Sequence, residues 1–299
     1  MNELSVLIPI FNFDASKLIE DIHIQLVKSN IVFEIRLYDD GSTDVYKTIN
    51  QKTQKLSNVV YKELPQNIGR SKIRNLLAKD ALYSNLLFMD CDNEIVKEDY
   101  ITQLLQYPLE QFSVVVGGTC YASTPPLDSN YYLHWLAGKY KEEKLAVERN
   151  INPYNSFTLN NMVIKKEVYL AVLLDENITT YGHEDSKFGI ELKSKNYKLW
   201  HVDNAICHIG LNENTVFLKK SLQAIDNLCR MIKNEDIGTD TKIYQTYLVL
   251  KKYGMTGIFY YVTKKIEGLI YRNLVSSKPS LVLFDVYKLN YLVYELGDF

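Results

Sequence analysis

Short apolar runs alternate with amphipathic helical patterns over the first 120 residues. The runs cover residues 4–10, 33–38, 59–61, 86–89 and 113–118, and the second of them alternates apolar residues with Glu34 and Arg36. Helical patterns separate them, from Asp14 to about Ser29, from Arg70 to about Leu82 and near 98–106. This alternation predicts an α/β fold with a largely parallel sheet flanked by helices on both faces. Because ligands bind at the carboxyl ends of strands in such sheets, the residues that follow each run are the candidates for function.

Carboxylates follow two of these runs directly. Asp39 and Asp40 come after the second run, ahead of a glycine and a Ser/Thr/Asp cluster, and Asp90 and Asp92 come after the fourth. Two carboxylates one residue apart at a strand end form a candidate site for a metal and a phosphate group. The same residues can instead form a turn or cap the next helix, because Asp bonds neighbouring backbone N–H groups.

The chain after residue 120 has a weaker pattern, and it then becomes strongly helical. We expect an aromatic and basic helical stretch between 121 and 153, and strands at 157–164, 197–202 and 205–208. A loop at 179–186 contains Glu184 and Asp185, which open a helix running to about Lys195. Beyond Glu213 the pattern is helical almost to the terminus, with breaks near Gly238, Gly254 and Pro279.

Composition narrows the function classes. The net charge of −2 gives no electrostatic reason to expect binding to nucleic acid. The four cysteines have no Cys-x-x-Cys spacing, so we expect reduced thiols in a cytoplasmic protein. The N-terminus lacks the pattern of a signal peptide, and no run has the ~20 apolar residues of a membrane-spanning helix. From Val216 onward the chain has 12 basic and 8 acidic residues, and this excess of positive charge allows peripheral contact with the inner face of a membrane.

Five separated motifs resemble the inverting family 2 glycosyltransferases with the GT-A fold. In chain order they are Ile8-Pro9-Ile10-Phe11-Asn12, Asp39-Asp40-Gly41-Ser42-Thr43-Asp44, Asn67-Ile68-Gly69 with Arg74-Asn75, Asp90-Cys91-Asp92 and Gly182-His183-Glu184-Asp185. The resemblance implies a Rossmann-like, mostly parallel mixed sheet flanked by helices. It also implies a catalytic domain over residues 1–215, with a nucleotide-binding half at 1–120 and an acceptor half at 121–215. It leaves a helical C-terminal region at 216–299.

The resemblance also implies roles for particular residues. The nucleoside would lie against Pro9, Asn12, Asp39 and Asp40, and Asp40 would accept a hydrogen bond from the base. The diphosphate would meet Arg74 and Arg70, although an arginine on an amphipathic helix can equally be solvated. A Mn²⁺ or Mg²⁺ ion would be held by Asp92, with Asp90 nearer the ribose and also counted as a ligand, and with His208 as a third ligand.

The acidic pair would carry out the transfer itself. The resemblance points to Asp185 as the base that takes the proton of the acceptor hydroxyl, with Glu184 holding the acceptor. His183 and Glu191 depart from the residues common in relatives at these positions. Residues that could line the sugar and acceptor sites, or that pack in the core, are Tyr131, Tyr132, Trp135, Asn160 and Asn161.

We therefore expect a metal-dependent inverting enzyme that moves a sugar from a nucleotide-sugar donor, with a UDP-sugar as the preferred class, to a glycan or lipid-linked acceptor in cell-surface polysaccharide synthesis. One alternative is a sugar-nucleotide nucleotidyltransferase, although the glycine-rich basic loop typical of that class is absent from Pro9 to Ser16. Another is a catalytically silent glycan-binding or scaffold protein. The C-terminal helices are expected to pack on the catalytic domain, contact a membrane or form a homodimer.

Overall fold

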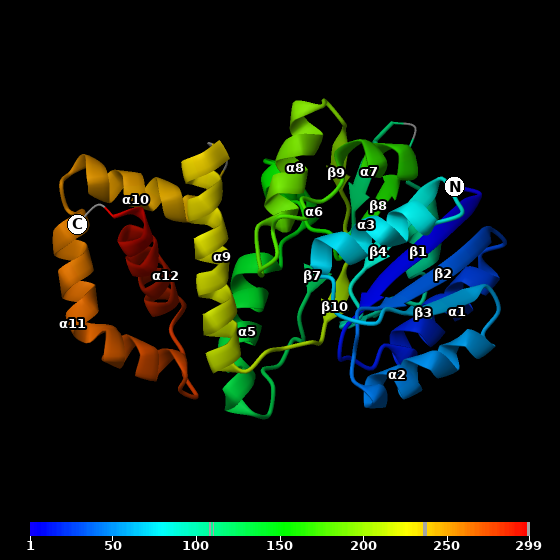
Figure 1. Cartoon of the computed structure of the whole chain (residues 1–299), viewed down its shortest axis with the longest axis horizontal. Coiled ribbons are helices and arrows are strands. Elements are labelled where there is room, and N and C mark those ends of the chain that lie inside the picture. The colour runs from blue at the N-terminus through cyan, green and yellow to red at the C-terminus, as the bar shows by residue number, and fades with distance from the viewer. Residues whose placement is uncertain (108, 110, 236–237, 298–299) are drawn as a thin grey trace. The chain divides into compact units, whose positions relative to one another are not determined.

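The computed structural model describes residues 1–107, 109, 111–235 and 238–297 (Figure 1). Within these residues the chain divides into two compact units, each built from separated segments. The first unit contains residues 1–121, 142–179 and 188–210, and the second contains 122–141, 180–187 and 211–299. These units are defined by contacts within the chain, whereas the predicted boundary at residue 215 divides the chain by function and stays a prediction.

A seven-stranded mixed sheet forms the centre of the first unit. Its order is β3 (Val59–Glu63), β2 (Val32–Asp39), β1 (Glu3–Ile10), β4 (Asn85–Met89), β8 (Asn161–Lys165), β6 (Val114–Val116) and β9 (Leu199–His201). Strands β3, β2, β1 and β4 are parallel to one another, β8 is antiparallel to β4 and β6, and β9 is parallel to β6. The predicted α/β class and mixed sheet are confirmed.

The register of the parallel strands brings the predicted nucleotide-binding residues to one edge. Pro9 lies opposite Tyr38 and Ile10 lies opposite Asp39, while Leu7 lies opposite Phe88 on the other side of β1. The segments that follow β1, β2 and β4 therefore emerge together at the carboxyl edge of the sheet.

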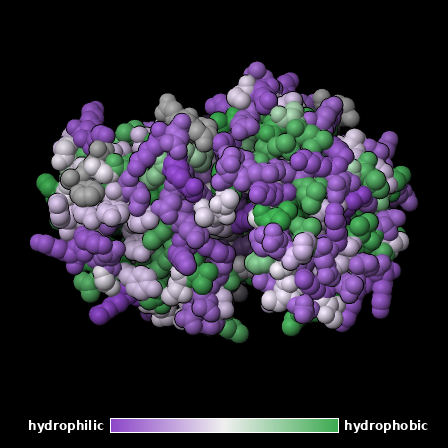
Figure 2. All heavy atoms as spheres, in the orientation of Figure 1, coloured by the Kyte–Doolittle hydropathy of each residue, from purple (hydrophilic) through white to green (hydrophobic). Residues whose placement is uncertain are grey.

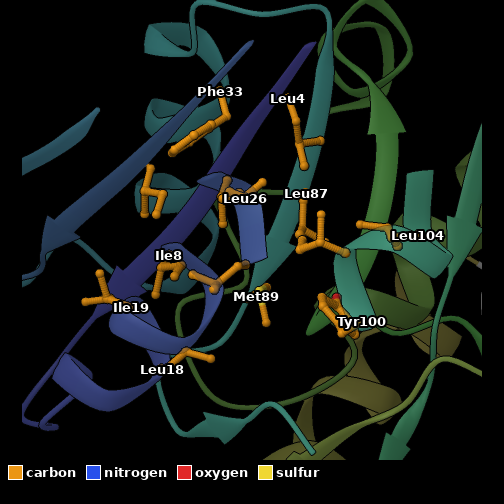
Figure 3. Packing of buried hydrophobic residues seen from close by; sticks show 14 of the residues in the cluster. Leu4, Ile8, Leu18, Ile19, Leu26, Phe33, Leu87, Met89, Tyr100 and Leu104 are labelled. Carbon is orange, nitrogen blue, oxygen red and sulfur yellow. The ribbon is translucent and has the colours of Figure 1, made fainter. Parts of the chain in front are cut away.

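Helices cover both faces of this sheet because its strands alternate their apolar side chains between the two faces. On one face Leu4 and Ile8 of β1 pack with Ile19 and Leu26 of α1 (Ser16–Lys28), as Figure 3 shows, and with α4 (Tyr100–Leu105). On the other face Leu7 packs with residues of α3 (Arg70–Asp80), α7 (Lys166–Val172) and α8 (Glu184–Ser194). The remaining short helical segments of the first unit are α2 (Asp44–Gln51), η1 (Lys52–Lys55), α6 (Ala146–Arg149) and η4 (Tyr154–Ser156).

A second, three-stranded sheet completes the first unit. Strand β10 (Ile206–His208) lies between β5 (Asn93–Glu94) and β7 (Thr119–Cys120), antiparallel to β5 and parallel to β7. The two outer strands were not predicted, since a two-residue strand shows no alternation. The strand predicted at 157–164 is wrong over its first half, because β8 begins at Asn161 and the buried Phe157 and Leu159 pack from a loop.

The second unit is helical. Its elements are η2 (Ser129–Tyr131), α5 (Tyr132–Ala137), the π-helical segment η3 (Gly138–Glu142) at its border, the first turn of α8, α9 (Asn214–Glu235), α10 (Lys242–Lys252), α11 (Thr256–Leu274) and α12 (Leu281–Leu296). Phe217, Leu274 and Phe284 form one of its cores, and Leu228, Tyr247 and Leu292 belong to another. The predicted helical C-terminal region is thus confirmed, with breaks near the expected residues.

Side chains of both polarities are interspersed over the visible surface (Figure 2). Among the described helices, none combines the length and the apolar character needed to cross a membrane.

Candidate functional site

The ends of β1 and β2 are joined by a network of polar side chains. Asp39, which is fully buried, accepts hydrogen bonds from the Ser42 backbone N–H at 2.7 Å and from the Tyr61 hydroxyl at 3.1 Å. Asn12 adopts a left-handed backbone with φ of 49°, and its side-chain oxygen accepts from the Thr43 N–H at 2.9 Å. Its own N–H donates to the Ser42 hydroxyl at 2.8 Å. Asp39 therefore holds the turn, which is the structural role that the sequence left open.

Asp40 connects the end of β2 to the loop before α3. Its two carboxylate oxygens accept hydrogen bonds from the N–H groups of Ile68 and Gly69, at 2.7 and 3.2 Å. Burial raises the pKa of Asp40 above its usual value, although both backbone bonds act in the opposite direction. Gly41 is required at the turn, because it has φ of +75° and a Cβ there would lie 2.7 Å from the Asn67 nitrogen. The carboxylate is fixed in place and retains lone pairs for a ligand.

Arg74 meets Asp90 at the carboxyl end of β4. Arg74 is 4% exposed, and its guanidinium donates hydrogen bonds to the Asp90 carboxylate and to the Arg70 carbonyl. Burial acts to raise the pKa of Asp90, but the positive charges of Arg74, Arg70 and His208 outweigh it and hold that pKa below the usual value. Asp90 therefore stays ionised beside a buried arginine, while Arg70 lies exposed at the first turn of α3.

Asp92 and His208 come together through the small sheet. The pairing of His208 with Asn93 places its Nδ1 3.6 Å from the Asp92 carboxylate. Burial acts to lower the pKa of His208, but the hydrogen bond and charge of Asp92 and the charges of Asp90 and Glu142 raise it overall. Gly210 permits the approach, because a Cβ there would lie 2.3 Å from an Asp92 carboxylate oxygen.

The three predicted metal ligands are not assembled as one set. Among the residues that the structure describes, no group of three or more His, Cys, Asp or Glu side chains is placed to hold a metal ion. Asp90 is instead bonded to Arg74. Asp92 and His208 fit a divalent cation as a two-residue anchor, since they offer a carboxylate oxygen and an imidazole nitrogen close together.

A cavity of about 210 Å³ opens beside the first turn of α3. The Ser71 hydroxyl is buried there and has no hydrogen-bond partner among the described residues. This cavity offers hydroxyl, ammonium, carboxylate and backbone groups next to the loop held by Asp40. Its lining residues are Asn67, Ile68, Gly69, Ser71, Lys72, Glu176, Ile178 and Thr179.

The acidic pair belongs to the second unit and lies in the first turn of α8. Glu184 is 7% exposed, and its carboxylate accepts a hydrogen bond from the Gly182 N–H at 3.0 Å. Gly182 and His183 both have positive φ, at 101° and 69°, so the chain turns sharply just before the helix. Asp185 follows at a partly buried position in the same turn, where the helix macrodipole favours a carboxylate.

Asn227 of α9 holds the loop that leads to this pair. Its side-chain amide nitrogen donates to the carbonyls of Thr180, Tyr181 and Gly182, at 3.4, 3.1 and 2.9 Å. Its oxygen accepts from the Thr180 hydroxyl at 2.9 Å. Sequence reasoning missed this residue. The sequence shows only an amide side chain in a helical pattern, and the burial of that amide becomes known only from the structure.

The predicted sugar-site and acceptor-site residues divide between surface and core. Asn161 is fully buried and accepts from the Tyr100 hydroxyl at 2.7 Å, while its amide donates to the carbonyls of Gly118 and Asn204. Trp135 is 8% exposed and donates to the Ala122 carbonyl at 2.9 Å. Both therefore serve packing, whereas Tyr131, Tyr132 and Asn160 are partly exposed.

A family model described as glycosyl transferase family 2 matches residues 5–169, more than half of the chain. The chain belongs to this family. It is therefore a glycosyltransferase, and the family model supports this class over the nucleotidyltransferase alternative.

Individual relatives of this glycosyltransferase are distant. It is 26% identical over 226 residues to a chondroitin synthase of Pasteurella multocida, covering 64% of this chain and 23% of that protein. It is 32% identical over 102 residues to an uncharacterized glycosyltransferase of Rickettsia felis, covering 34% of this chain and 17% of that protein. The matched part thus spans less than a quarter of either relative's length.

Solved structures share the GT-A fold of this glycosyltransferase. The mannosyltransferase PcManGT of Pyrobaculum calidifontis, in complex with GDP-Man and Mn²⁺, has a TM-score of 0.56 at 12% identity and covers 99% of this chain and 87% of that one. The S. aureus protein TarS 1–349, in complex with UDP, has a TM-score of 0.50 at 16% identity and covers 99% and 90%.

Proposed function

We propose that this glycosyltransferase is a metal-dependent inverting enzyme that moves a sugar from a UDP-sugar to a glycan or lipid-linked acceptor in the synthesis of a cell-surface polysaccharide. The observation that carries the proposal is the pair of charged contacts after β4, Arg74 with Asp90 and Asp92 with His208. They gather cationic groups and a candidate metal anchor where a parallel sheet presents its ligands.

The nucleotide diphosphate would be held by the first unit. Asp40 would accept a hydrogen bond from the base, with Pro9, Asn12 and the Asp39 turn forming the wall beside it. Arg74 and Arg70 would face the diphosphate, since guanidinium groups bond phosphate oxygens in pairs. Mn²⁺ or Mg²⁺ bound by Asp92 and His208 would neutralise charge on the leaving diphosphate.

The proton transfer would be carried out by the acidic pair. Asp185 would take the proton of an acceptor hydroxyl, whose oxygen then forms the new bond to the anomeric carbon. The bond from that carbon to the diphosphate oxygen breaks, and the electron pair leaves with the diphosphate. Glu184 would hold the acceptor and, through its bond to the Gly182 N–H, the shape of the loop.

The donor class can be tested by thermal unfolding with UDP, GDP and CDP, each with and without Mn²⁺. We expect UDP with Mn²⁺ to raise the melting temperature, because a ligand that binds only the folded state stabilises it. The TarS and PcManGT structures described above contain UDP and GDP-Man respectively, so GDP is the informative competitor. If none of the three nucleotides shifts the transition, the proposal is wrong in both donor and metal.

The base can be tested by Asp185→Asn. This variant should retain metal-dependent stabilisation by the nucleotide and lose transfer by at least about 100-fold, the usual contribution of a general base. Asp175→Asn, in the loop before the acidic pair, is the matched control. Transfer that persists in Asp185→Asn would place the base elsewhere, and the absence of transfer in the wild type with any acceptor would favour the silent glycan-binding alternative.

The class of acceptor also affects where in the cell the enzyme would act. The curated relative named for its product is a chondroitin synthase, which supports a polysaccharide acceptor for this chain. A cytoplasmic site at the inner face of a membrane would suit a lipid-linked acceptor. Homodimer formation stays a prediction that gel filtration can test.

A further inference from the structure

Helix α11, orange in Figure 1, has two apolar faces. Thr263, Ile270 and Leu274 are buried against the rest of the second unit. At 100° per residue the opposite side carries another apolar group, whose members are 56–66% exposed. We call this side the outer face of α11; it consists of Ile258, Tyr261, Val262, Lys265, Leu269 and Arg272.

Exposed hydrophobic side chains are concentrated in the chain segment that contains this face. Among the described residues, 29 large hydrophobic side chains are exposed, and 10 of them fall within residues 248–271. These 24 residues are a small part of the chain, so the density there is several times the average. An exposed apolar concentration with polar borders is typical of a docking surface.

Positive charge is concentrated in the same segment. Residues 241–280 contain seven basic residues and one acidic residue, a net charge of +6, although the whole chain has a net charge of −2. The single acidic residue, Glu267, is paired with Lys264 at 2.7 Å. Lys265 and Arg272 lie on the outer face itself, among its apolar side chains.

We propose that the outer face of α11 docks on an anionic membrane surface, with the helix lying in the plane of the interface. Ile258, Val262 and Leu269 would enter the boundary between head groups and acyl chains, and Tyr261 suits the interface because its ring is amphipathic. Lys265 and Arg272 would meet anionic head groups. A second copy of this chain is a poorer occupant, since two identical +6 segments repel each other. The docking rests on the proposed function only for its purpose, which is access to a lipid-linked acceptor.

Flotation of the full chain with vesicles tests this proposal. We expect binding to vesicles of phosphatidylcholine with phosphatidylglycerol, none to phosphatidylcholine alone, and weaker binding at high salt. Ile258→Ser with Leu269→Ser should weaken binding at least about ten-fold, because each side chain loses its burial in the bilayer. Lys265→Glu with Arg272→Glu should have an effect of similar size.

A matched control replaces equally exposed side chains elsewhere. Val45→Ser with Val147→Ser, at 67% and 71% exposure, should leave vesicle binding unchanged. Circular dichroism and melting temperature would verify that every variant folds.

Four results would overturn the proposal: no binding to any vesicle, equal binding to neutral vesicles, binding that survives the outer-face variants, or binding that the control variant weakens as much. A dimer that Ile258→Ser with Leu269→Ser dissociates, in a chain that binds no vesicle, would make the face an interface between copies instead. Nucleotide-induced stabilisation of the same variants separates the two proposals. Vesicle binding without any nucleotide response would contradict the glycosyltransferase mechanism and leave the docking standing.

Discussion

At the scale of single residues, the contact between Arg74 and Asp90 matters both for folding stability and for the proposed binding of the diphosphate. The Arg74 side chain is 5% exposed and the Asp90 side chain 23%, and Arg74 is the largest of the positive charges that offset the burial of Asp90. A buried pair of this kind contributes little net stability, but removal of one partner leaves a desolvated charge. The same arginine is the group that we expect to face the diphosphate. Its folding role and its ligand role can be separated, because only the first is measurable without nucleotide.

Arg74→Ala should lower the free energy of unfolding by about 3 kcal/mol, because the carboxylate of Asp90 then loses its buried partner. Urea unfolding of the ligand-free protein measures this. Arg70→Ala, at the exposed position one turn earlier, should cost less than about 1 kcal/mol. Adding Asp90→Asn to the Arg74→Ala variant should recover part of the loss. Equal effects of the two arginine substitutions would show that the Arg74–Asp90 contact is not the cause.

At the scale of elements, the long strands and helices of the first unit were predictable, and the shortest elements were not. The apolar runs at residues 4–10 and 86–89 have the length of a strand, and both are strands in the structure. The predicted breaks near Gly238, Gly254 and Pro279 lie between consecutive helices. Strands β5 and β7 have two residues each, too few for any periodicity, yet their pairing with β10 brings His208 to Asp92. The family resemblance suggested Asp92 and His208 as metal ligands, and the pairing of β10 with β5 explains why the two side chains lie close together.

Helix α9 has an equally hidden role at the element scale, and Asn227→Asp tests it. The substitution keeps the size of the side chain but replaces the donor to three carbonyls by an oxygen that repels them. We expect transfer to fall at least about ten-fold through misplacement of the 180–185 loop, with nucleotide stabilisation retained. Asn234→Asp, exposed on the same helix, adds the same charge and should have no effect. Unchanged transfer in Asn227→Asp would show that α9 does not position the loop.

At the scale of the whole molecule, the chain organises itself differently from the linear order of its motifs. Residues 122–141 and 180–187 group with 211–299, so the loop bearing Glu184 and Asp185 belongs with the C-terminal helices rather than with the sheet. No local pattern reports such grouping, because it depends on contacts between segments far apart in sequence. The distribution of charge, by contrast, is readable from the sequence alone, and so is the basic character of 241–280.

The pH dependence of global stability between pH 6.5 and about 4 should be dominated by His201. This side chain is 1% exposed, its Nδ1 accepts from Arg149 at 2.8 Å, and its Nε2–H donates to the Pro153 carbonyl at 2.8 Å. Burial, and then the charge of Arg149, lower the pKa of His201 to about 4, against the opposing hydrogen bond to Pro153. The imidazole is therefore neutral in the folded chain.

The sign follows from proton counts in the two states. Between pH 6.5 and about 4 the unfolded chain binds a proton at His201 that the folded chain refuses, so stability falls as pH falls through this window. The full loss from this residue is about 3 kcal/mol. Burial also lowers the pKa of His183, which acts in the same direction, whereas the raised pKa of His208 acts in the opposite one.

Urea unfolding at a series of pH values from 7.5 to 4 would measure this loss. His201→Gln removes the titrating ring and keeps a side chain that can accept from Arg149, so its stability should depend less on pH by about the same 3 kcal/mol. His23→Gln, at a partly exposed position on α1, is the control and should retain the wild-type dependence. Arg149 also donates to the carbonyls of Val116 and Val202, so protonation of His201 would disturb the contacts that hold α6 against β6 and β9.

Wild-type stability that does not change down to pH 4 would mean that these contacts open locally without global unfolding. Hydrogen exchange at β9 would then measure the local opening.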